Sequence, residues 1–169
     1  MSYARLQTEI LEARDARESA LYSAVDTAQG SVVFASLSIP GEDKTLAGVA
    51  GLFAWMLSRI EKMPWKLHWH VPVTSDALGP YCIFSTRTSL KTVKSACVEI
   101  EESAPAARLI DLDVYDPGAG RIGRAEMGLP SRRCLLCDDS ATNCIRLHRH
   151  DQESLKRHVS LLLEDFTDI

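Results

Sequence analysis

The sequence lacks an excess of basic residues and any long apolar run, and each absence excludes a class of protein. The formal net charge is −4 at pH 7, so no overall positive field attracts nucleic acid, and we expect no nucleic-acid partner. The opening MSYARLQTEI has no apolar core of the signal-peptide kind. No run approaches the roughly 18 residues of a membrane span. We therefore expect a cytoplasmic protein without a membrane partner.

The sequence also lacks an even set of cysteines, internal repeats, low-complexity tracts and linkers. Five cysteines in a chain expected to be cytoplasmic argue against a disulfide framework. The 169 residues, 46% of them apolar, are enough to bury a core without cross-links. We predict one domain over residues 1–169.

The spacing of apolar residues predicts an α+β fold with a mixed or antiparallel sheet and flanking helices. Helical periodicity predicts four helices, and alternation or short apolar runs predict four strands. The helices are expected at 6–28, 46–60, 90–100 and 151–166, and the strands at 31–39, 66–73, 80–86 and 108–116. Gly30 stands at the usual stop position of the first helix. The turn at 117–120 is expected to send the chain back antiparallel.

The first predicted helix carries two arginines on an apolar stripe. Arg14 and Arg17 share this stripe with Ile10 and Leu21. Arginine can lie along an apolar border and keep its charged head in water. It can also bind a phosphate through two parallel hydrogen bonds. Both interpretations are open from the sequence.

Two aspartates lie two residues apart in the predicted strand 108–116. Its alternation points the carboxylates of Asp111 and Asp113 to one face. Adjacent carboxylates repel unless a cation lies between them, and Mg²⁺ bound also by substrate phosphates meets that need. An exposed acidic strand face is the alternative. The glycine-serine pair that often precedes such aspartates in nucleotidyltransferases is absent, so any relation to that fold would be distant.

The segment CLLCDDSATNC, followed by IRLHRH, contains three cysteines and two histidines. The spacing of Cys134 and Cys137 is that of a zinc knuckle, and Cys144 with a histidine would complete a tetrahedral set. A second CxxC pair is missing, so buried thiols are an alternative, with a helix starting near residue 138 or 139. Redox chemistry is a third, although the expected strand-CxxC-helix context is lacking.

Two long runs resemble the CitX family, the citrate lyase holo-[acyl-carrier-protein] synthases. They are RLIDLDVYDPGAGRIGR and GLPSRRCLLCDDSATNCIRLHRH. The family pattern consists of GRLxDxDV, an arginine, P-x-R-x-CLLC, six residues, C-x-R and a histidine. ILEARDAR resembles its LLxxRDxR element. Ala107 replaces the usual glycine, and His150, rather than His148, occupies the position of the histidine.

The resemblance implies a transferase. Such an enzyme moves a phosphoribosyl-dephospho-CoA group from triphosphoribosyl-dephospho-CoA to a serine of the citrate lyase acyl carrier protein subunit, and pyrophosphate leaves. The partner supplies the nucleophile, so the enzyme must supply charge stabilisation and alignment. The alternatives are the equivalent transferase for a malonate decarboxylase-type carrier, and a non-catalytic zinc-knuckle adaptor.

We infer the site roles from chemistry and position, because the resemblance does not assign them. Asp111 and Asp113 would hold Mg²⁺ across the triphosphate. Glu99, or Glu101 at an expected solvated helix end, would add a carboxylate or act as a general base. A structural Zn²⁺ would be bound by Cys134, Cys137, Cys144 and His150. The phosphates would be bound by Arg14, Arg17, Arg108, Arg124 and Arg132.

Overall fold

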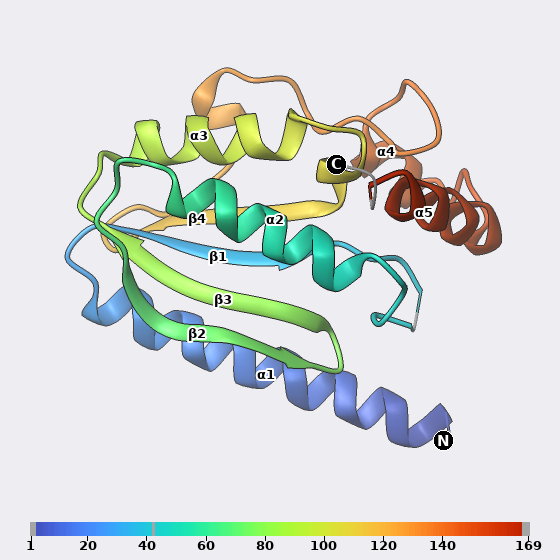
Figure 1. Cartoon of the computed structure of the whole chain (residues 1–169), viewed down its shortest axis with the longest axis horizontal. Helices are drawn as coiled ribbons and strands as arrows, with labels where there is room; N and C mark the ends of the chain where they lie inside the picture. Colours follow the sequence, from blue (N-terminus) through green and yellow to red (C-terminus); the bar gives the residue numbers. More distant parts are fainter. Residues whose placement is uncertain (1–2, 42, 167–169) are drawn as a thin grey trace.

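The structure, a computed structural model, describes residues 3–41 and 43–166. Five strands form one sheet in the order β2-β3-β1-β4-β5, with helices on both faces (Figure 1). All neighbouring strands are antiparallel. The predicted α+β fold is therefore confirmed. The strands are β1 (Ser31–Leu37), β2 (His68–Asp76), β3 (Gly79–Thr86), β4 (Ile110–Asp116) and β5 (Gly120–Ile122).

The helices divide between the two faces of the sheet. α2 (Val49–Glu61) and α3 (Leu90–Glu102) cover one face, and α5 (Gln152–Phe166) packs at the end of this layer (Figure 1). The main core lies here and includes Val33, Met56, Phe84, Ile100, Leu112 and Leu163. α1 (Tyr3–Thr27) crosses the opposite face, mainly under β1, β2 and β3, over a smaller apolar cluster. None of the described helices is long and apolar enough to cross a membrane.

Several predicted boundaries differ from the structure, and two of these differences bear on the site. The strand predicted at 108–116 begins at Ile110, because Ala106–Leu109 form a 3₁₀ turn, η1, after Pro105, whose φ of −54° suits a helical start. The helix expected near residue 138 or 139 is α4 (Ala141–Arg146), capped by the Ser140 side chain. It starts later because the carbonyl of Asp139 accepts a hydrogen bond from the amide of Cys134, which holds both in a hairpin.

Gly30 has a different role from the one its position indicates. The usual helix stop places a glycine in the left-handed region, but Gly30 is not among the residues with positive φ. A Cβ atom at Gly30 would lie 2.3 Å from the carbonyl oxygen of Thr86. Glycine is needed here because the entry to β1 passes close to the end of β3.

Candidate active site

The two aspartates of β4 point to the face of the sheet that α1 occupies. Asp111 lies opposite Ser36 and Asp113 opposite Phe34 in the register with β1. The alternate residues, among them Leu112, are fully buried in the main core. The structure therefore places both carboxylates on one face, as the alternation predicted.

Each aspartate has an arginine beside it. Arg132 Nη2 lies 3.3 Å from Asp111 Oδ1, and Arg121 Nη1 lies 3.3 Å from Asp113 Oδ1. The pKa of Asp111 is nevertheless raised, because burial and the neighbouring Asp113 outweigh the opposing effect of Arg132. Asp111 and Asp113 therefore still repel each other although each has an arginine beside it.

Glu101 lies at the centre of a buried ion-pair network. It is 3% exposed, so the expectation of a solvated helix end is wrong. Its Oε1 lies 2.9 Å from Arg132 Nη2, and its Oε2 lies 2.9 Å from Arg124 Nη2. The physical reason for its burial is the position of α3, which packs over β4 and brings Glu101 to the strand's open edge.

This edge is open because β5 pairs with β4 only from Val114 to Asp116. On this edge the backbone of Leu112 has no strand to pair with, and two buried charged side chains of α3 supply its hydrogen bonds. Leu112 N donates to Glu101 Oε1 over 3.0 Å, and Lys94 Nζ donates to the carbonyl of Leu112 over 3.1 Å. Glu101 and Lys94 therefore replace the missing strand.

Glu99 is not brought to the aspartates. It is exposed on α3, and α3 covers the core face of the sheet (Figure 1). Asp111 and Asp113 point to the other face. The sheet and helix layers thus separate it from the carboxylate pair.

Three of the predicted phosphate-binding arginines line one cavity, and one of them, Arg132, contacts Asp111. Arg108, Arg124 and Arg132 line one cavity of about 650 Å³, together with Glu101 and Glu102. Arg108 also donates to the carbonyl of Cys134 over 2.6 Å, which joins η1 to the cysteine segment. This cavity combines several guanidinium groups with the acidic side chains that hold them in position.

The two arginines of α1 differ in environment. Arg17 is 8% exposed, donates to both carboxylate oxygens of Asp76 over 2.8 and 2.6 Å, and lies 4.2 Å from the ring centre of Tyr81. The guanidinium group of Arg17 is therefore not in water. The interpretation that Arg17 lies along an apolar border with its charged head in water is wrong. Arg14 is exposed. The pKa of Lys44 is lowered, first by burial and then by the positive charges of Arg14 and Arg17. These three cationic side chains therefore lie near one another.

Two residues of the aspartate face were missed in the sequence. Tyr115 and Arg121 oppose each other in the β4–β5 hairpin. With Arg17 and Asp113 they line a cavity of about 500 Å³ between α1 and the sheet. The pKa of Tyr115 is raised, first by burial and then by the negative charge of Asp113. The same alternation that identified the aspartates indicates Tyr115, and the tight turn indicates Arg121.

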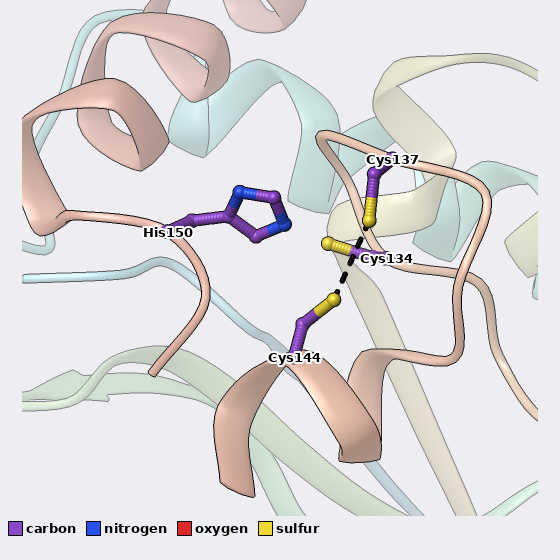
Figure 2. Close-up of side chains that lie close together, drawn as sticks. All are labelled: Cys134, Cys137, Cys144 and His150. Carbon is purple, nitrogen blue, oxygen red and sulfur yellow. Dashed lines mark hydrogen bonds between the residues drawn. The ribbon is translucent and has the colours of Figure 1, made fainter. Parts of the chain in front are cut away.

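The structure brings together the four residues of the predicted zinc set. Ligand atoms of Cys134, Cys137, Cys144 and His150 all lie within 4.8 Å of one another (Figure 2). Cys137 Sγ and Cys144 Sγ are 3.4 Å apart. His148 lies outside this group. The cluster adjoins the arginine cavity through the bond from Arg108 to Cys134.

Comparison with known proteins identifies relatives over nearly the whole chain. An apo-citrate lyase phosphoribosyl-dephospho-CoA transferase from Escherichia coli O1:K1 / APEC is 29% identical over 160 residues, which are 93% of this chain and 87% of the relative. One from Shigella flexneri serotype 5b (strain 8401) has the same identity and coverage. The family model described as "CitX: Apo-citrate lyase phosphoribosyl-dephospho-CoA transferase" matches residues 6–166, which include the β4 aspartates and the cysteine cluster. The chain therefore belongs to the CitX family.

Proposed function

We propose that this chain transfers the phosphoribosyl-dephospho-CoA group of triphosphoribosyl-dephospho-CoA to a serine of the apo acyl carrier protein subunit of citrate lyase. The serine hydroxyl loses its proton as its oxygen bonds to the phosphorus next to the ribose, the bond from that phosphorus to the leaving diphosphate breaks, and pyrophosphate and the proton are released. In a chain of this family, the proposal rests mainly on the two aspartates of β4 and the arginines that pair with them: Arg121 with Asp113, and Arg132 with both Asp111 and Glu101.

The arginine cavity suits a leaving pyrophosphate. Planar guanidinium groups bind phosphate oxygens through paired hydrogen bonds. Glu101 and Asp111 both contact Nη2 of Arg132 and hold the guanidinium group in place, so it needs little reorganisation to face a phosphate beside Asp111. The network would thus supply positive charge where negative charge develops as pyrophosphate leaves.

The aspartate pair fits a hard divalent cation. Asp111 and Asp113 offer carboxylate oxygens on one face, and burial together with the charge of Asp113 raises the pKa of Asp111, so a cation between the two carboxylates would relieve their repulsion. Two carboxylates leave most positions of an octahedral ion to phosphate oxygens and water. Mg²⁺ bound there would stabilise charge on the transferred phosphoryl group. We propose no role for Glu99 in this arrangement, because it lies exposed on α3.

Intact-protein mass spectrometry tests the proposal. We expect the apo carrier protein of citrate lyase, incubated with the chain, triphosphoribosyl-dephospho-CoA and Mg²⁺, to gain the mass of one phosphoribosyl-dephospho-CoA group. One pyrophosphate should be released per group, and a carrier with its acceptor serine replaced by alanine should gain nothing. Preferential loading of a malonate decarboxylase-type carrier would reassign the substrate. If neither carrier gains mass, the transferase proposal is wrong, and the non-catalytic zinc-knuckle adaptor is the remaining alternative.

Arg14→Lys is expected to weaken binding of the precursor about tenfold, or about 1.4 kcal/mol. Lysine keeps the charge but cannot make the planar two-point contact with a phosphate. Isothermal titration calorimetry measures the change. Arg5→Lys is the matched control, because Arg5 is an exposed arginine of the same helix that pairs with Glu9. Equal affinities for wild type and Arg14→Lys would assign Arg14 to a solvated helix face.

A further inference from the structure

The stretch between β5 and α5 has almost no core of its own. Residues 123–150 are all described, and Cys134 and Cys144 are the only buried residues among them. Its single α-helix, α4, has six residues. Ordering each residue costs on the order of 1–2 kcal/mol of conformational entropy. Two buried thiols offset little of that cost, so the stretch needs a further interaction to hold it.

The geometry of the four side chains matches a metal site. Zinc–sulfur bonds of about 2.3 Å in a tetrahedron place neighbouring sulfurs roughly 3.8 Å apart. Here Cys137 Sγ and Cys144 Sγ are 3.4 Å apart, and all four ligand atoms lie within 4.8 Å of one another. Figure 2 shows the three sulfurs and a nitrogen of the His150 ring directed at one another. They come from the loop 134–137, from α4 and from the segment before α5.

An unpartnered nitrogen independently indicates a ligand. Among the described residues, His150 Nε2 is the one buried side-chain nitrogen or oxygen without a hydrogen-bond partner. Leaving such an atom unsatisfied is unfavourable, and native proteins rarely do so. In addition, the amide of Leu136 donates to Cys134 Sγ over 3.4 Å, a contact that suits a thiolate acceptor. A metal ion would give the imidazole its partner.

We propose that Cys134, Cys137, Cys144 and His150 bind one structural Zn²⁺. Three thiolates and an imidazole are soft and borderline ligands, which favour zinc over Mg²⁺ or Ca²⁺. All four positions are filled by the protein, so the site is closed and holds the fold rather than binding substrate. Binding releases the three thiol protons. Through Arg108 and the backbone of Cys134, the ion would fix the wall of the arginine cavity.

Metal analysis of the full chain tests the site without any measurement of transfer. We expect one zinc per chain after purification and dialysis, retained until three thiols are titrated with a mercurial reagent. Chelation should lower the melting temperature by about 10 °C or more, and added Zn²⁺ should restore it. Substituted Co²⁺ should give the ligand-field spectrum of a tetrahedral thiolate site.

Variants separate these ligands from other cysteines and histidines. Cys137→Ser and His150→Ala should purify with less than a tenth of the zinc. Cys82→Ala, at a buried cysteine of β3, and His148→Asn should keep it; His148 has φ +45°, which asparagine tolerates. If a ligand variant does not fold, the mercurial titration of the wild type still tests whether three thiols hold the zinc. A metal-free wild type, zinc lost on dialysis, or a disulfide between Cys137 and Cys144 would each overturn the proposal.

Discussion

Asp111→Asn and Asp113→Asn are each expected to lower the rate of transfer about 1000-fold or more while leaving the fold intact. Asparagine keeps the shape of the side chain but offers a divalent cation no negative charge. The loss should appear in the turnover rate at saturating precursor, because the cation acts most strongly on the charge that develops as pyrophosphate leaves.

The fold should survive because ionised Asp111 opposes folding. Its pKa in the folded chain is raised, mainly by burial, so the folded state binds the proton more tightly than the unfolded state. This cost is present at neutral pH and is relieved as the pH falls through the raised pKa. Asp111→Asn removes the cost, and its melting temperature at pH 7 should equal or exceed that of wild type.

Three measurements check this prediction. The transfer rate is followed by mass spectrometry, the melting temperature by circular dichroism, and cation binding by the rise in melting temperature with Mg²⁺, which both variants should lack. Asp26→Asn, at an exposed carboxylate of α1, is the control and should behave as wild type. Wild-type turnover of both β4 variants at saturating Mg²⁺ would reduce the aspartates to an acidic strand face.

Glu101→Ala is expected to lower the free energy of unfolding by about 3–5 kcal/mol. The substitution leaves Arg124 and Arg132 without their shared buried partner and Leu112 N without an acceptor at the open edge of β4. Urea denaturation followed by circular dichroism measures the change, with an unchanged m-value expected for two-state unfolding.

Glu102→Ala is the matched control for this effect. Glu102 follows Glu101 in the same helix and also pairs with Arg124, but its side chain is 59% exposed. An exposed ion pair contributes about 0–1 kcal/mol. If Glu101→Ala does not fold, Glu101→Gln keeps the acceptor for Leu112 and isolates the loss of charge. Equal effects at the two glutamates would mean that burial of Glu101 contributes nothing.

Much of the architecture follows from local spacing. Alternation over 110–114 set the face of Asp111 and Asp113, and the side chain of Ser89 caps α3 by accepting a hydrogen bond from the amide of Thr92. The family signature and the Cys-x2-Cys spacing are likewise properties of the linear chain. Such features depend on periodicity and short-range hydrogen bonds, which neighbouring residues determine.

Only the tertiary structure decided which charges meet. Arg17 pairs with Asp76, and Arg132 reaches both Glu101 and Asp111. Glu101 looked like a solvated helix end because sequence spacing cannot show that β5 is too short to cover the edge of β4. Packing of α3 over that edge buries Glu101, which pairs with Arg124 and Arg132, and leaves Glu99 exposed away from the aspartates. Ion pairs between residues far apart in the sequence depend on which helices and strands pack together, and the local spacing of residues does not determine this packing.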